Sequence, residues 1–151
     1  MAVGAEKPCF GRFFMYGHRM VKASWTKAIK DIFAPFNRER EHIVVVYIKK
    51  DGDKEEFISE LLGIGCKDFV SFNPDFIVSF AAEFKIKNFF LVHNHPSDDT
   101  RPSLADLRST RSIQGLAAKE GLIFHDHIVV GSGLEKFESI LDSGRVGMVG
   151  Y

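Results

Sequence analysis

The sequence predicts a single domain of the α/β class, in which helices pack around a mixed β-sheet. Runs of β-branched and aromatic residues, typical of buried strands, occur in several parts of the chain beside segments with apolar residues at helical spacing. The chain has 151 residues, of which 45% are apolar, and this length suits one domain with a core of its own. No internal repeat or low-complexity tract interrupts the pattern.

An amphipathic helix and a β-hairpin are expected in the first half of the chain. Apolar residues recur at helical spacing over residues 21–34. The run HIVVVYI at 42–48 predicts a buried strand. The Asp51-Gly52 turn predicts a hairpin that joins this strand to a second one at 56–62.

Helices and strands are also expected in the second half. Residues 73–84 predict a helix that begins with an Asn cap and a Pro at its first position, and NFFLV at 88–92 predicts a buried strand. A helix over 103–120 should stop at the glycine that follows it. A strand over 122–131 comes next, and a short helix over 134–141 is expected to close the domain.

Composition excludes several classes of protein. Lys and Arg number 20, as do Asp and Glu, so the totals show no basic field of the kind that a nucleic-acid binder usually carries. The two cysteines, Cys9 and Cys66, lie far apart and form no CxxC pattern, which argues against a disulfide framework and a thiolate zinc site. The sequence shows no secretion signal and no membrane span. A reducing, cytoplasmic setting is therefore expected.

Two histidines mark the candidate site. His93 and His95 stand two positions apart where the expected strand ends, and side chains at that spacing in an extended chain point to the same side. Two imidazoles that converge on one point suit a metal ion. The alternative is a pair of ordinary surface histidines.

A serine and a carboxylate follow at short distance. On a helical wheel Asp106 falls on the face of Ile113 and Ala117, which is turned to the core, and a lone buried carboxylate is costly unless it is paired or bound to a metal. Ser103 and Asp106 also match a capping box, which explains them without a ligand. Their closeness to the two histidines favours a site.

Two neutral imidazoles and one carboxylate make a set of three ligands with an open fourth position. This is the arrangement of catalytic rather than structural zinc. A water molecule in the open position would have its pKa lowered towards ~7. Hydrolysis would further require a base and a donor for the oxyanion.

The spacing resembles a known motif. His93-x-His95, seven residues, Ser103, two residues and Asp106 resemble the JAMM motif, H-x-H-x7-S-x2-D, of the MPN domain family of metallopeptidases. LVHNHPSDDTRPSLADLRST looks most like the RadC branch, and REHIVVVYIKKDG and HDHIVVG resemble two strands of that branch. The resemblance implies an N-terminal arm and amphipathic helix at 1–37, an MPN domain at 38–145 and a C-terminal tail at 146–151.

The resemblance also implies roles. Zinc would be held by His93, His95 and Asp106, and Ser103 would be the oxyanion donor. Glu41 matches the general acid/base that opens an early strand, with Glu39 as the near alternative, although a solvated charge in the RERE run is the ordinary interpretation of Glu41. Three further glutamates fit less well because they lie past the turn: Glu55, Glu56 and Glu60.

Two features depart from the pattern or could distract from it. Asp98 stands where the RadC branch usually has Gly, and Asp99 follows; these carboxylates either repel an acidic substrate or only form a turn. His125-Asp126-His127 is a second His-x-His, which we expect to be structural or to support the metal ligands rather than to bind a metal itself. His18 and His42 are treated as ordinary histidines.

The leading hypothesis is a zinc-dependent metallohydrolase that cleaves a peptide or isopeptide bond in a peptide or protein substrate. One alternative is an accessory domain in DNA repair or recombination, as the RadC resemblance suggests. Its nucleic-acid contacts would fall on a local basic patch: Lys27, Lys30, Arg38 and Arg40. The other alternative is a catalytically silent interaction module that binds zinc without turnover.

Overall fold

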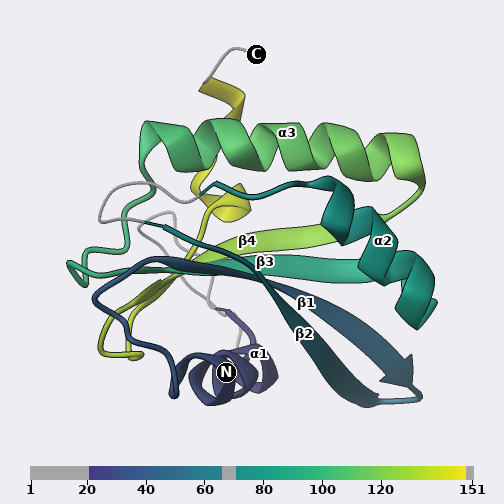
Figure 1. The fold of residues 1–151 in the computed structure, drawn as a ribbon, viewed down its shortest axis with the longest axis horizontal. Helices are drawn as coiled ribbons and strands as arrows, with labels where there is room; N and C mark the ends of the chain where they lie inside the picture. The colour runs from purple at the N-terminus through teal and green to yellow at the C-terminus, as the bar shows by residue number, and fades with distance from the viewer. Residues whose placement is uncertain (1–20, 66–70, 149–151) are drawn as a thin grey trace.

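A computed structural model describes residues 21–65 and 71–148 (Figure 1). The expected N-terminal arm, together with Cys9, His18 and Cys66, lies outside the described residues. The elements, in chain order, are α1 (Ala23–Phe33), β1 (His42–Asp51), β2 (Lys54–Ile64), α2 (Asp75–Phe84), β3 (Asn88–His95), α3 (Leu104–Glu120), β4 (Ile123–Gly131), β5 (Phe137–Ser139) and two 3-10 turns, Leu141–Ser143 and Val146–Met148.

A five-stranded mixed sheet forms the middle layer, with the strand order β2-β1-β3-β4-β5. β3 and β4 are parallel, and every other neighbouring pair is antiparallel. Figure 1 shows α2 and α3 over one face of the sheet and α1 over the other. The predicted α/β class and mixed sheet are therefore confirmed.

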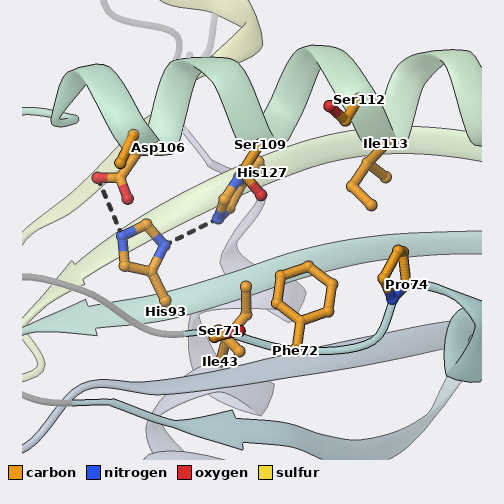
Figure 2. A pocket seen from close by; sticks show the side chains of 11 residues that line it. Ile43, Ser71, Phe72, Pro74, His93, Asp106, Ser109, Ser112, Ile113 and His127 are labelled. Carbon is orange, nitrogen blue, oxygen red and sulfur yellow. Dashed lines mark hydrogen bonds and ion pairs between the residues drawn. The ribbon is translucent and has the colours of Figure 1, made fainter.

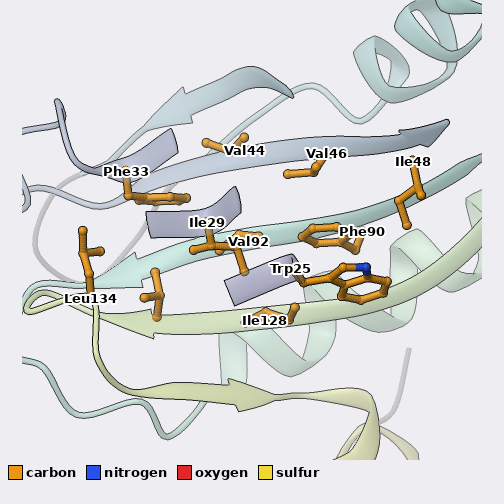
Figure 3. Close-up of a cluster of buried hydrophobic side chains, with 11 residues drawn as sticks. Trp25, Ile29, Phe33, Val44, Val46, Ile48, Phe90, Val92, Ile128 and Leu134 are labelled. Carbon is orange, nitrogen blue, oxygen red and sulfur yellow. The ribbon is translucent and has the colours of Figure 1, made fainter. Parts of the chain in front are cut away.

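Two apolar layers hold the helices to the sheet. Trp25, Ile29 and Phe33 of α1 pack against alternate residues of β1, such as Val44 and Val46 (Figure 3). The intervening residues of β1 face the other way and meet α2 and α3, in a cluster that includes Val45, Tyr47, Ile77, Ile113 and Ala117. Because β1 is buried on both faces, its sequence is a continuous apolar run.

One predicted element is wrong. The expected helix over 134–141 contains strand β5, which pairs with β4 so that Phe137 lies opposite Val130 and Ser139 opposite Ile128. Leu134 has a φ of 60°, a left-handed conformation that no α-helix accommodates. The apolar spacing of this segment suits a helix, but pairing with the edge of β4 satisfies its backbone and outweighs the local preference.

Candidate metal centre

Three donor atoms converge at the end of β3. The Nε2 atoms of His93 and His95 lie 3.0 Å apart. The Oδ2 atom of Asp106, in the first turn of α3, lies 3.2 Å from His93 Nε2 and 3.0 Å from His95 Nε2. Figure 2 shows Asp106 reaching down from α3 towards His93. The structure thus brings together the three residues that the sequence predicted as metal ligands.

The spacing of these atoms fits a tetrahedral ion. Ligands bonded to zinc at about 2.0–2.1 Å in tetrahedral geometry stand about 3.3–3.4 Å from one another. The observed separations of 3.0–3.2 Å require only a slight expansion to reach those values. His93 is fully enclosed, with 1% of its side chain exposed, whereas 12% of His95 and 13% of Asp106 remain exposed. The centre is therefore open to solvent from the His95 and Asp106 side.

A chain of hydrogen bonds fixes which nitrogen of His93 carries the proton. The Thr110 hydroxyl donates to the backbone oxygen of Asp106 at 2.8 Å, so its oxygen must accept the bond of 2.6 Å from His127 Nδ1. His127 Nε2 is then an acceptor, and His93 Nδ1 must donate to it at 2.8 Å. His93 Nε2 is left with a lone pair directed at the metal position.

Electrostatics support the same protonation state of His127. Burial, followed by the nearby His93, lowers the pKa of His127 to about 3. The imidazole is therefore neutral at physiological pH and can accept from His93. His127 therefore orients His93, one of the predicted ligands, and is not itself among the converging donor atoms.

His95 offers its Nε2 in the same way. Its Nδ1 donates to the backbone oxygen of Asp99 at 2.7 Å. Burial opposes ionisation of His95, but its hydrogen bonds to Asp106 and to the Asp99 backbone outweigh this effect and raise its pKa. Burial likewise raises the pKa of Asp106, but when a proton lies on Nε2 of His93 or His95 the hydrogen bond to that imidazole more than reverses the effect, so the carboxyl stays ionised. Two facing lone pairs and an anion require a cation between them, whether a proton or a metal ion.

Glu41 reaches this centre because β1 runs antiparallel to β3. Ile43 pairs with His93, so the residues just before β1 lie beside the end of β3. Glu41 is buried, with 5% of its surface exposed, and its carboxylate lies within 4.8 Å of ring nitrogens of His93 and His95. Asp106 Oδ2 lies 3.2 and 3.0 Å from the two Nε2 atoms, so two carboxylates flank the imidazole pair, and the choice of Asp106 as the ligand and Glu41 as the base stays a prediction. Glu39 is exposed and outside this cluster.

Asn94, which the sequence analysis did not single out, holds the Glu41 segment in place. Its side chain is completely buried. Its Oδ1 accepts from the backbone N–H of His42 at 2.8 Å, and its Nδ2 donates to the backbone oxygen of Arg40 at 3.0 Å. Asn94 therefore fixes both neighbours of Glu41, while the histidines on either side of it point to the metal position. The only sequence signal for this role is the identity of the residue between the two histidines, an asparagine.

The capping box and the predicted ligand set share one atom, Asp106 Oδ2. Ser103 Oγ accepts from the backbone N–H of Asp106 at 3.0 Å, and Asp106 Oδ2 accepts from the backbone N–H of Ser103 at 2.9 Å. The two interpretations of these residues are therefore compatible. Because Ser103 Oγ is an acceptor in this pair, its own hydrogen remains available to a bound molecule.

The second His-x-His does not converge. β4 carries one more residue than β3 between the pairs Phe89–Phe124 and Leu91–His127, which is a β-bulge. The bulge turns His125 to the α1 face, where its ring lies 6.2 Å from that of Trp25, while His127 faces α3. Asp126 between them accepts from the Ser139 hydroxyl at 2.5 Å. This motif therefore provides no second metal site.

The carboxylates after the histidines are already paired. Asp98 accepts from the Gly133 N–H at 3.2 Å and forms an ion pair with Lys136 at 3.2 Å, and these contacts lower its pKa. Hydrogen bonds from Arg101 hold the pKa of Asp99 at about 2. Asp98 has a φ of 69°, which explains why a glycine also suits the position. Both residues form a turn, and neither presents an unpaired charge to a substrate.

A cleft of about 240 Å³ adjoins the metal position. It lies between α3 and the segment that leads into α2, with His93 and Asp106 at one end (Figure 2). Ser109 and Ser112 line it from α3, opposite Phe72 and Pro74. A substrate bound here would extend from the metal position along α3.

Comparison with known proteins identifies the family. The profile of the RadC-like JAB domain matches residues 23–144. The chain belongs to the RadC-like JAB domain family. The resemblance to the RadC branch of the MPN domains is thereby confirmed. A protein of Rhodobacter capsulatus named UPF0758 protein is 44% identical over 71 residues, which are 47% of this chain and 33% of that relative. The match thus spans only about a third of the relative's length.

Three of the four residues of the predicted basic patch make contacts within this RadC-like JAB domain. Lys27 pairs with Asp31 at 3.2 Å and Lys30 with Glu135 at 3.4 Å. The guanidinium of Arg38 donates to backbone oxygens of Ser132 and of the last turn of α1. These contacts occupy most of the patch on which nucleic-acid binding would rest. Among the helices that the structure describes, none is long and apolar enough to cross a membrane.

Proposed function

We propose that this RadC-like JAB domain is a zinc-dependent hydrolase that cleaves a peptide or isopeptide amide bond. The observation that carries the proposal is the convergence of His93 Nε2, His95 Nε2 and Asp106 Oδ2 within 3.0–3.2 Å of one another. The hydrogen bonds behind both rings leave these nitrogens as lone-pair donors. A peptide or protein is the proposed substrate, and a reducing, cytoplasmic compartment is the proposed setting.

The surrounding residues are arranged for acid–base work on an amide. A zinc ion at this position would supply Lewis acidity, which acidifies a water molecule and polarises a carbonyl group. Glu41 lies close enough to take a proton from an attacking water and to pass it to the leaving nitrogen. Ser103 can donate its hydroxyl hydrogen to the oxygen of the scissile carbonyl as negative charge develops there.

Metal analysis tests the ligand assignment. Purified wild type should carry about one equivalent of zinc after dialysis, and His95→Ala should carry almost none, because a site of three ligands loses most of its affinity with one of them. His125→Ala is the matched control, since it removes a histidine from the other His-x-His and should leave the zinc content unchanged. Equal zinc in wild type and His95→Ala would place the metal elsewhere and refute the assignment.

A cleavage screen tests the activity. The zinc-loaded chain should cut members of a peptide and isopeptide library, read by mass spectrometry, and Glu41→Gln should carry zinc but leave the library intact. Stoichiometric zinc without any cleavage across both classes of bond would refute hydrolysis and favour the silent interaction module.

A further inference from the structure

The cleft beside the metal position offers no partner to a charged group. Among the residues that the structure describes, no lysine or arginine lines it, and its only carboxylate is that of Asp106, which is directed at the two imidazoles. Phe72 and Pro74 form one wall, and Ile43 and Ile113 add apolar surface. A charge placed here would lose hydration without gaining an ion of opposite sign, which is costly. The cleft therefore suits an uncharged group.

Small residues of α3 keep the cleft open and line it with hydroxyl groups. Ala105, Ser109 and Ser112 face it from α3, at a spacing that places them along one side of the helix. Figure 2 shows Ser109 on the side of α3 that faces the sheet. The hydroxyls of Ser109 and Ser112 have no hydrogen-bond partner among the described residues. Each can therefore donate to, or accept from, a bound molecule.

The proposed base lies at the other end of the metal position. α3 runs from Asp106 to Ile113, which packs with Leu91, so the cleft extends from the metal position back along β3. Glu41 precedes Ile43 and does not line the cleft. Because β1 is antiparallel to β3, Glu41 lies on the far side of the metal position. A leaving nitrogen that takes its proton from Glu41 points to that side, so the acyl part of the substrate occupies the cleft.

The dimensions of the cleft suit an extended peptide. At 1.5 Å per residue of helix, Ser109 and Ser112 lie about 4.5 and 9 Å along α3 from Asp106. An extended chain rises about 3.3 Å per residue, so the two serines lie beside the first three residues on the acyl side. The volume of about 240 Å³ exceeds that of a cavity of about 150 Å³ that holds benzene. A side chain as large as that of leucine or phenylalanine therefore fits, together with part of the backbone.

We propose that the cleft binds the acyl side of a peptide substrate and selects an uncharged residue, of about the size of leucine or phenylalanine, beside the scissile bond. The backbone of the bound segment forms hydrogen bonds with the hydroxyls of Ser109 and Ser112, and the selected side chain packs between Phe72 and Ile113. The direction of the peptide rests on the proposed hydrolysis, whereas the preference for an uncharged residue does not.

Two small probes test this preference without turnover. The full chain, labelled with ¹⁵N, is titrated with N-acetyl-L-leucinamide and, separately, with the α-amide of N-acetyl-L-glutamic acid. A chelator is present, so that no metal ion can bind the carboxylate of the second probe. The leucine probe should move the amide signals of Ser109 and Ser112 saturably, with a dissociation constant on the order of a few millimolar, as expected for about a dozen heavy atoms. The glutamate probe should bind about fivefold more weakly or worse, because its carboxylate meets no cation.

Variants that fill the cleft test the location. Ser112→Leu changes an exposed residue, so the fold should persist, and it should weaken binding of the leucine probe about tenfold, because its side chain occupies the close-packed space. Ser109→Leu should do the same. Ala118→Leu is the matched control, since Ala118 is exposed on α3 and outside the cleft, and it should bind as wild type does.

Three results would overturn the proposal. These are unmoved signals of both serines with the leucine probe, equal affinity for the two probes, and equal weakening by Ala118→Leu and Ser112→Leu. Selective binding together with an uncut peptide library would refute the hydrolysis, and with it the direction of the peptide, while the preference for an uncharged residue would stand. The failure of the cleft and the failure of the proposed function are therefore distinguishable.

Discussion

Replacement of Thr110 by Val should weaken metal binding without touching a metal ligand. Thr110 is completely buried, and its hydroxyl joins His127 to the backbone of Asp106. Val has nearly the same shape but cannot accept from His127 Nδ1. Without an acceptor at Nδ1, the tautomer of His127 with its proton on Nδ1 is no longer favoured. The proton of His127 can then move to Nε2, which faces His93 Nδ1. His93 would in turn carry its own proton on Nε2, where the metal has to bind.

The size of the effect follows from burial. A buried donor that loses its acceptor costs about 1–3 kcal/mol of stability, so the free energy of unfolding of the metal-free chain should fall by that amount. Substitution of a residue that orients a metal-ligating histidine typically lowers metal affinity by about 10–100-fold. The zinc affinity of Thr110→Val should therefore be about 10–100-fold lower than that of wild type.

Two measurements separate the tautomer from a general loss of structure. Zinc affinity is obtained by competition with a chromophoric chelator, and the protonated nitrogen of His93 is obtained from ¹⁵N shifts of the metal-free chain. Thr110→Ser should restore both, because it keeps the hydroxyl. Ser109→Ala, on the cleft side of the same helix, should change neither. Wild-type zinc affinity in Thr110→Val would refute the role of the hydrogen-bond chain.

Four further predictions concern separate features. Glu41→Gln should keep zinc and fold but lower the rate of hydrolysis by about 10²–10⁴-fold, measured on any peptide that wild type cleaves. If Glu39→Gln shows this loss and Glu41→Gln does not, Glu39 is the general base. Chelation of the metal should leave the circular dichroism spectrum nearly unchanged, because the apolar core forms without it, and a random-coil spectrum would contradict this. Gly131→Ala should lower the melting temperature, because its methyl group would collide with the Asp98 carboxylate, and Asp98→Gly should restore it in the double variant. Burial raises the pKa of Tyr47 above its usual value of 10.0, so its contribution to stability is present below pH 10 and is lost as the pH rises above that value. Urea unfolding of Tyr47→Phe should show a smaller loss of stability above pH 10.

The convergence of the proposed ligand residues could be predicted because their geometry is local. His93 and His95 share one strand, and Ser103 and Asp106 share one helical turn, so fixed periodicities determine which way they point. Glu41 was placed by resemblance, and the antiparallel pairing of β1 with β3 explains its position.

The parts that the sequence did not reveal depend on contacts between distant segments. The hydrogen bonds of Asn94 to the strand entry and of Thr110 to His127 span 54 and 17 positions, and no periodicity encodes them. The bulge in β4 reverses the direction of His125 relative to His127, against the rule of alternation. The strand at 137–139 likewise arises from pairing with β4, which a local helical pattern does not anticipate.

The sharing of one carboxylate oxygen between a helix cap and the metal position has a consequence for how ligand variants are interpreted. The Ser103 N–H orients Asp106 Oδ2 as soon as α3 forms. The carboxylate is therefore already ordered before a metal ion binds, and binding costs little side-chain entropy at this residue. Loss of Asp106 therefore removes both the cap of α3 and a proposed metal ligand. Loss of His95 removes only a proposed metal ligand. Instability of the metal-free chain should accompany Asp106→Ala and be absent from His95→Ala, so only the histidine variant isolates the contribution of the ion.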